Sequence, residues 1–202
     1  MSVSIVYETH ALTVDNETGF ATGWLPGELS EAGRRGATGL GERRRGDGLA
    51  AVYCSDLRRA VETVGIAFAG SELPVHLDER LRECDYGELN GMPVARLDAD
   101  RAARIEEPWP DGESYRNVVR RTRAFLDDLA GDRDGQRVLL VAHSANRWAL
   151  QHLLEGEPLE RLVDAPFAWP AGIRARSPPF WVGCDSHHER YRDLPRGSVP
   201  IS

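Results

Sequence analysis

The chain has 202 residues, enough for one ordinary domain with a sizeable core. Its formal net charge of -7 argues against nucleic acid or an anionic membrane surface as the general partner, and no apolar run approaches the roughly 18 residues that a membrane-spanning helix needs. There is no lysine, so chemistry that depends on a lysine Schiff base or a Walker-type lysine is excluded, while arginine remains available for binding anions. The expected partner is a small molecule.

The cysteines and the N-terminal residues indicate the compartment. Cys54, Cys84 and Cys184 are odd in number and form no CxxC pair, which is typical of reduced thiols. The first ten residues show neither the basic nor the apolar region of a secretory signal. We therefore expect a cytoplasmic protein with one catalytic domain over residues 1–170, followed by a polar extension over residues 171–202 that is rich in proline and arginine.

The first half of the chain alternates between strand and helix patterns. Residues 3–7 form a short apolar strand, and a glycine-containing loop then leads to a helix from an N-cap at Ser30 to about residue 45. Residues 50–54 predict a second strand, followed by a helix that opens at Ser55 or Asp56 and carries apolar residues at helical spacing. A brief extended segment at 74–77 precedes an irregular stretch at 81–93.

The second half repeats this alternation. Residues 113–129 have apolar positions at a helical period, residues 138–142 form a continuous apolar run typical of a buried strand, and a helix is predicted over 145–154. Strands that alternate with helices predict an α/β fold, a three-layer doubly wound sheet that is mostly parallel with helices on both faces. Beyond about residue 170 the pattern ends.

Chemically useful residues follow three of the predicted strands. In an open α/β sheet, ligands bind at the carboxyl ends of the strands, and here those ends deliver His10, Arg59 and His143. A lone histidine after a strand is more often a surface or hydrogen-bonded residue, but two histidines and an arginine at one edge indicate an anion site. The chain has no GxSxG, HExxH or CxxC motif, so we expect no metal and no cofactor.

Six segments in order resemble the histidine phosphatase superfamily, the phosphoglycerate mutase-like fold, over about residues 3–155. The stretch from Thr9 to Asn16 resembles the family's RHGxTxxN in its histidine, threonine and asparagine, and residues 20–33 resemble the continuation seen in mutases. Ser55 to Thr63 resembles SDLxRAxxT, and residues 81–91 resemble a segment LRE…G…G that contains Glu83. Residues 112–114 match GES and residues 141–144 resemble VSHG.

The resemblance implies a phosphatase that acts on a small phosphorylated or anionic substrate. In such an enzyme His10 attacks phosphorus and forms a phosphohistidine, while Arg59, His143 and Asn16 donate hydrogen bonds to the phosphoryl oxygens. Glu83 protonates the leaving oxygen and then activates water. The resemblance assigns catalytic roles to His10, Glu83 and His143, and it requires no metal.

One position departs from the family pattern, because Thr9 stands where the family has its first arginine. A charge-assisted hydrogen bond is worth roughly 1.5 to 3 kcal/mol, so we expect weaker phosphate binding. Three explanations compete. In the first, Arg82 or Arg147 supplies the guanidinium that the family's first arginine would provide. In the second, the pocket takes a less charged substrate, and in the third, the domain is a binding module without catalysis.

A phosphoglycerate-type mutase is the alternative within the catalytic class. Phe20, Gly23 and Trp24 are mutase-like, but the chain is short of the insertions that would close over a mutase substrate, so hydrolysis is preferred. A homodimer is a candidate assembly that the sequence does not decide. Site assignments therefore place His10, Glu83 and His143 in catalysis, and the residues expected to bind substrate are Arg59, Asn16, Thr9 and Arg82.

Overall fold

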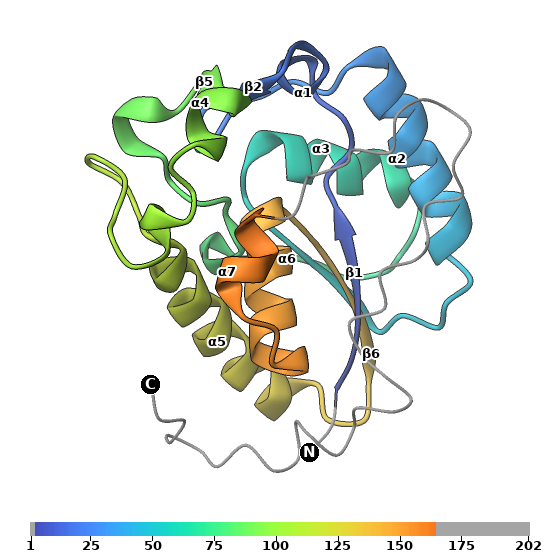
Figure 1. The fold of residues 1–202 in the computed structure, drawn as a ribbon. Helices are drawn as coiled ribbons and strands as arrows, with labels where there is room; N and C mark the ends of the chain where they lie inside the picture. The colour runs from blue at the N-terminus through green and yellow to red at the C-terminus, as the bar shows by residue number, and fades with distance from the viewer. Residues whose placement is uncertain (1–2, 165–202) are drawn as a thin grey trace.

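The computed structural model describes residues 3–164, so the predicted extension over 171–202 lies outside the described residues. Its centre is a four-stranded parallel sheet in the order β1, β6, β3, β4, formed by Ser4–Thr9, Arg137–Ala142, Ala51–Cys54 and Val75–Leu77 (Figure 1). Thr9 pairs with Ala142 and Cys54 with Val141, so three strands end at nearly the same level. His10, His143 and Ser55 each follow one of these strand ends.

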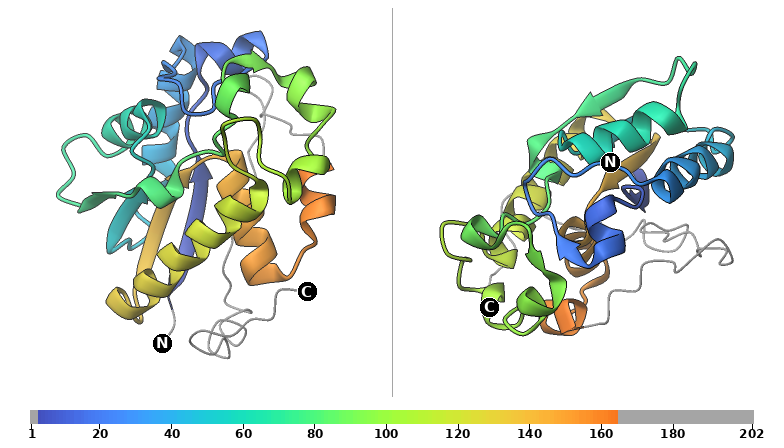
Figure 2. Two further views of the ribbon diagram at one scale, coloured as in Figure 1. Left: turned by 90° about the vertical axis from the view of Figure 1, so that its left-hand side faces the viewer. Right: turned by 90° about the horizontal axis from the view of Figure 1, so that it is seen from above.

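Helices cover both faces of the sheet, as predicted (Figures 1 and 2). Strand alternation sends Ile5 and Tyr7 to one face, where they pack with residues of α5 (Tyr115–Asp132) and α6 (Ser144–Leu150). Val6 points to the opposite face, among residues of α2 (Glu31–Arg44) and α3 (Arg58–Ala67). Both faces are apolar, which explains why the strands appear in the sequence as continuous apolar runs.

Short elements lie over the carboxyl ends of the strands (Figure 1). They include α1 (Val14–Thr18), α4 (Val94–Asp98) and a two-stranded antiparallel ribbon of β2 (Phe20–Ala21) with β5 (Met92–Pro93). Three 3-10 turns, at Glu79–Leu81, Gly87–Leu89 and Ala103–Ile105, belong to the same region. We call residues 79–114 the capping segment. After α6 the chain continues through a π-helical turn, Gln151–Glu155, into α7 (Leu159–Asp164).

Several predicted boundaries shift. The first strand extends to Thr9, so His10 follows it directly. The helix predicted after the second strand, α3, starts at Arg58 rather than at Ser55 or Asp56. The Ser55 hydroxyl accepts the Leu57 N–H at 3.2 Å and forms a local turn before the helix. The predicted helix at 145–154 ends as an α-helix at Leu150. The short ribbon and α1 were not predicted, since segments of two to five residues carry too little periodicity.

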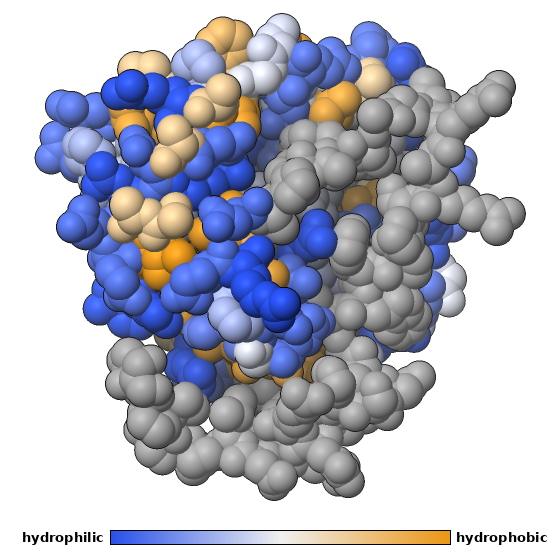
Figure 3. Space-filling model, viewed as in Figure 1, coloured by the Kyte–Doolittle hydropathy of each residue, from blue (hydrophilic) through white to orange (hydrophobic). Residues whose placement is uncertain are grey.

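Over the described residues, the surface is largely hydrophilic and the helices are too short or too polar to span a membrane, as expected from the charged composition and the lack of long apolar runs. Where Figure 3 shows described residues, hydrophilic side chains predominate and apolar side chains form small groups. Among residues 3–164, no helix is both long and apolar enough to cross a membrane.

Candidate active site

His10 is held with a defined tautomer at the end of β1. Its backbone N–H donates to Ala142 O at 3.0 Å, and the side chain is 5% exposed. Nδ1 lies 2.8 Å from Ala11 O, and since a carbonyl can only accept, Nδ1 carries the proton. Nε2 accepts the Nε–H of Arg59 at 3.2 Å. Burial, and then the charge of Arg59, lower the pKa of His10 from 6.5 to about 3, so the ring is neutral at pH 7.

Arg59 joins the two histidines to the loop that follows β2. From the first turn of α3 its Nη2 donates to Gly23 O at 2.8 Å and lies 3.2 Å from His143 Nδ1, while Nη1 donates to Leu25 O at 3.3 Å. The side chain is buried, and desolvation lowers its pKa, although a guanidinium remains protonated near neutral pH. The structure thus brings the predicted arginine into direct contact with His10 and His143.

Local packing holds α2 and α3 against the segment that follows His10. The Thr63 hydroxyl donates to Arg59 O at 2.6 Å and accepts the Ala11 N–H at 2.9 Å. On α2, a Cβ at Gly33 would lie 1.9 Å from Leu12 O, so the helix can approach this segment only because it has glycine there. These contacts fix the position of His10 relative to Arg59.

His143 presents a buried N–H that has no acceptor among the described residues. It caps α6 and is fully buried, with its ring centroid 5.0 Å from that of His10. A guanidinium only donates, so His143 Nδ1 accepts from Arg59 and the proton lies on Nε2. Burial, followed by Arg59 and His10, holds the pKa of His143 well below 6.5. Tyr7 donates to the His143 carbonyl at 2.5 Å and anchors its backbone.

Glu83 lies at the N-terminus of α6 and is 6% exposed. Its Oε1 accepts the backbone N–H of Cys84 at 2.8 Å and of Ala145 at 3.2 Å, and Oε2 accepts the Ser144 hydroxyl at 3.2 Å. Trp24 donates Nε1–H to the Glu83 carbonyl at 2.7 Å. The carboxyl group is therefore positioned by the first residues of the helix that begins directly after His143.

Thr9 and Glu8 point to opposite faces of β1. Thr9 lies on the same face as Tyr7, and its side chain forms a hydrogen bond with the Tyr7 hydroxyl. Burial raises the pKa of Tyr7, and this hydrogen bond lowers it by a smaller amount. Glu8 turns the other way, 2.9 Å from Arg44 Nε and 3.6 Å from Arg43 Nη2. The acidic neighbour of Thr9 is thus neutralised on the far side of the sheet, as strand alternation allows.

Two residues that were predicted to bind substrate form their side-chain hydrogen bonds with other parts of the protein. Arg82 pairs with both carboxylate oxygens of Asp56, at 2.8 and 2.5 Å, and its guanidinium lies 4.8 Å from the ring centroid of Trp24. Its fork therefore faces Asp56, not His10. Asn16 Oδ1 accepts from the backbone and the hydroxyl of Thr13, at 3.1 and 2.7 Å, in a capping box for α1. Its side-chain amide group remains a candidate donor.

Sequence reasoning missed the contribution of Tyr7, because an aromatic residue within an apolar strand predicts only core packing. Within residues 3–164, no group of three His, Cys, Asp or Glu side chains is placed to hold a metal ion. The assembled groups are a neutral imidazole with an unprotonated nitrogen, a guanidinium, a buried imidazole N–H and a carboxyl group. Together they suit nucleophilic transfer of an anionic group.

Comparisons with known proteins place the chain among its relatives. The family model of the histidine phosphatase superfamily, branch 1, matches residues 9–172. A probable phosphoglycerate mutase, GpmB, of Yersinia enterocolitica is 32% identical over 162 residues, covering 74% of this chain and 73% of the relative. Phosphoserine phosphatase 1 of Hydrogenobacter thermophilus is 28% identical over 167 residues, covering 79% of each. A mycobacterial glucosyl-3-phosphoglycerate phosphatase, solved with VO3, has a TM-score of 0.69 and 32% identity, covering 79% of this chain and 85% of that one.

Proposed function

Because the chain belongs to the histidine phosphatase superfamily, we propose that it hydrolyses a small phosphate monoester through a phosphohistidine on His10. The observation that carries this proposal is the hydrogen-bonding state of the His10 ring. Nδ1–H is held by Ala11 O, which leaves the Nε2 lone pair next to Arg59. Since burial keeps the pKa of His10 near 3, the ring can attack phosphorus without a separate base.

The reaction has two steps. In the first, the Nε2 lone pair of His10 forms the N–P bond while the ester P–O bond breaks, and protonated Glu83 gives its proton to the leaving alcohol oxygen. In the second, water attacks phosphorus, Glu83 takes a proton from that water, and the P–N bond returns its electrons to Nε2. Inorganic phosphate leaves, and both side chains regain their starting states.

The donors around His10 stabilise the charge on the transferring group. Arg59 moves its Nε–H from His10 Nε2 to a phosphoryl oxygen, and His143 donates the Nε2–H that has no acceptor among residues 3–164. Thr9 and Asn16 are also predicted to contact the phosphoryl group. With threonine at the position of the family's first arginine, we expect the phosphate to bind more weakly than it would with two guanidinium groups.

Turnover of p-nitrophenyl phosphate by the wild-type chain and by His10→Ala tests the hydrolase. We expect release of p-nitrophenol by the wild type and at least a thousandfold slower release by the variant. Mass spectrometry of rapidly quenched wild-type protein should find a phosphoryl group on His10, labile to acid. Equal near-zero rates in both proteins, with phosphate ligands still bound, would favour a binding module.

A mutase is kept as the second candidate because phosphoglycerate mutases are among the relatives. Incubation with a phosphoglycerate distinguishes the two reactions. A hydrolase releases inorganic phosphate, whereas interconversion of isomers without phosphate release would show a mutase. A cytoplasmic location, independence from metals and a homodimer remain predictions from the sequence.

A further inference from the structure

The chain on either side of Glu83 rests on a largely buried ion pair. Arg121 lies in α5 and Glu113 precedes that helix, and their side chains are 15% and 20% exposed. Nε of Arg121 donates to Oε1 of Glu113 at 3.0 Å, and Nη2 donates to Oε2 at 3.0 Å. Such a pair loses much of its hydration, so it adds little to stability unless its remaining donors and acceptors find partners. Its other partners therefore indicate what it does.

Both members of the pair bind the backbone around Glu83. Arg121 donates from Nη1 to Arg80 O at 2.6 Å and from Nη2 to Glu83 O at 2.9 Å. Glu113 Oε2 accepts the Asp85 N–H at 3.1 Å, and the Glu113 N–H donates to Asp85 O at 2.9 Å. The pair therefore contacts the main chain before Glu83, at Glu83 and after it.

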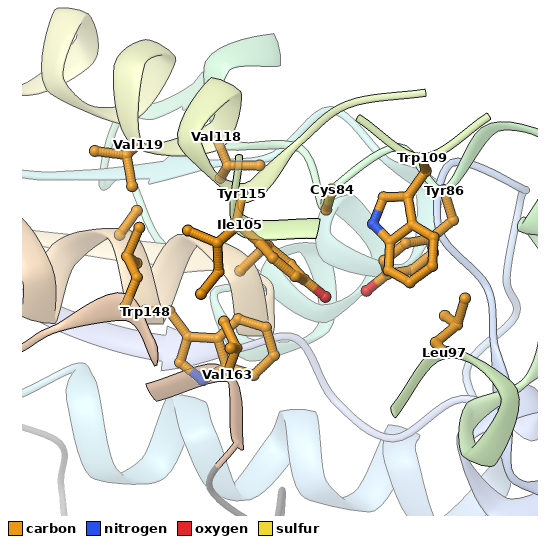
Figure 4. Close-up of a cluster of buried hydrophobic side chains, with 13 residues drawn as sticks. Cys84, Tyr86, Leu97, Ile105, Trp109, Tyr115, Val118, Val119, Trp148 and Val163 are labelled. Atoms are coloured by element: carbon orange, nitrogen blue, oxygen red, sulfur yellow. The ribbon is translucent and has the colours of Figure 1, made fainter. Parts of the chain in front are cut away.

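No helix or strand includes residues 82–86, so the regular backbone hydrogen bonds of such elements do not hold this part of the capping segment. The side chains of Cys84 and Tyr86 lie in the apolar cluster shown in Figure 4, together with residues of α5. Apolar packing is not directional, whereas hydrogen-bonded carbonyls fix the orientation of the peptide groups beside Glu83. Arg121 therefore adds orientation to a segment that α5 already holds by packing.

Arg121 lies near the phosphate-binding groups, but its own donors are already engaged. Four of the five N–H groups of its guanidinium are used in the bonds to Glu113, Arg80 and Glu83, which leaves little for binding a phosphate. Burial is the main cause of the lowered pKa of His143, and among the four causes the charge of Arg121 contributes least. The geometry therefore favours a role through Glu83 over direct contact with the substrate.

We propose that Arg121, held by Glu113, is a positioning residue that sets where Glu83 delivers its proton to the leaving oxygen. This inference rests on the proposed function, since it takes Glu83 as the acid. Proton transfer requires the donor to lie within hydrogen-bond reach of the acceptor, so a small displacement of the Glu83 backbone slows it. Arg59 and His143 lie on other elements and keep their places. The sequence motifs assign Glu113 only to the start of a helix and leave Arg121 without a role.

Two aryl phosphates of similar shape test the inference through their leaving groups. Phenolate is a poorer leaving group than p-nitrophenolate, so hydrolysis of phenyl phosphate depends more strongly on the acid. In Arg121→Gln we expect kcat/KM to fall about 10- to 100-fold for phenyl phosphate and less than about threefold for p-nitrophenyl phosphate. The parameter kcat/KM covers the steps up to P–O cleavage, so the later hydrolysis of the phosphohistidine does not enter. Arg121→Lys, which keeps the charge but not the planar fork, should show a smaller fall for phenyl phosphate.

Arg116→Met is the matched control. Arg116 lies on the same helix and also pairs with a glutamate, donating from Nε and Nη2 to Glu106 Oε1 at 3.1 and 2.6 Å. These bonds end at Glu106 and not on the backbone around Glu83, so we expect the ratio of the two kcat/KM values to stay as in wild type. In a Glu83→Gln background, Arg121→Gln should change that ratio no further, because its effect is transmitted through the carboxyl group that this background lacks.

Hydrogen exchange tests the position of Glu83 without turnover. The Cys84 and Ala145 N–H groups both donate to Glu83 Oε1, at 2.8 and 3.2 Å. Ala145 lies in the first turn of α6, where an N–H has no partner within the helix, so its protection depends on Glu83. NMR should find both amides exchanging at least about tenfold faster in Arg121→Gln than in wild type, and at the wild-type rate in Arg116→Met.

If Arg121→Gln fails to fold, Glu113→Gln, which weakens the same pair, takes its place in both experiments. An equal fall of kcat/KM for the two esters, or amide exchange unchanged at both positions, would overturn the inference. Failure of the proposed function looks different. In that case wild-type protein releases no phosphate from either ester, or Glu83→Gln keeps the wild-type ratio, and amide exchange still shows whether Arg121 holds Glu83.

Discussion

Two regions meet at Glu83, and they are organised in different ways. The strand-exit side consists of His10, Arg59 and His143, which follow β1, β3 and β6 and contact each other directly. The capping segment, residues 79–114, has 3-10 turns and short elements in place of long helices. The ladders of the parallel sheet place the strand ends of the first group, whereas local backbone turns and side-chain hydrogen bonds together hold the second.

Asn90 illustrates how the capping segment is held. Its Oδ1 accepts the backbone N–H groups of Trp24 and Tyr86, at 3.2 and 3.1 Å, and its Nδ2 donates to Asp85 at 2.7 Å. A Cβ at Gly23 would lie 1.7 Å from that Oδ1, so the loop beside Arg59 depends on glycine to approach Asn90. The capping segment thus depends on particular side-chain pairings, whereas the strand-exit side depends on the register of the sheet.

The largest effect should come from Arg59→Met, which removes the cation of the strand-exit side. We expect kcat/KM for an aryl phosphate to fall by about 10²- to 10³-fold, because the guanidinium stabilises charge on the phosphoryl oxygens. The free energy of unfolding should change much less. Burial of a charged guanidinium carries a desolvation cost, which also lowers the pKa of Arg59, and burial of a neutral methionine does not. Steady-state kinetics and urea unfolding separate the two effects. A variant with near-normal kcat/KM would remove Arg59 from the mechanism.

Acidification should destabilise the strand-exit side through its histidines. The pKa of His10 is about 3 when folded and near 6.5 when unfolded, so between these values the unfolded chain binds more protons and stability rises with pH. His143 shifts in the same direction. Each group then contributes up to about 1.4 kcal/mol per pH unit below pH 6.5. In urea unfolding from pH 7 to 4.5, His10→Gln should show a shallower loss than wild type, and parallel curves would contradict the assignment.

The same contrast explains how much could be predicted from the sequence. The apolar runs at residues 138–142 and 50–54 predicted the strands, and parallel strands necessarily bring His143 and Arg59 to one edge. Arg82 could not be placed by its proximity to Glu83. The backbone of Arg82 is extended, with φ -60° and ψ 156°, so the two side chains diverge, and Arg82 turns to Asp56. Such pairings depend on which distant side chain lies opposite, and periodicity contains no information about that.

A smaller effect is expected from Gly33→Ala, which tests how closely α2 supports the segment after His10. The new Cβ would lie 1.9 Å from Leu12 O, and the strain outweighs the gain in helix propensity, so unfolding free energy should fall by about 1 to 2 kcal/mol. Gly36→Ala, on the same helix with nothing within 4 Å, is the matched control and should stabilise by about 0.5 to 1 kcal/mol. If both substitutions stabilise, the close approach is wrong.

The smallest effect concerns Trp24, which links the two regions. Trp24→Phe removes the Nε1–H that donates to the Glu83 carbonyl at 2.7 Å and keeps a ring beneath Arg82. Arg121 still donates to the same carbonyl at 2.9 Å, so Glu83 loses one of two anchors. We expect kcat to fall about two- to fivefold with KM nearly unchanged, because the phosphate donors stay in place while the acid moves slightly. A raised KM with normal kcat would instead show that Trp24 takes part in substrate binding. Glu83 would then not mark the point where the two regions meet.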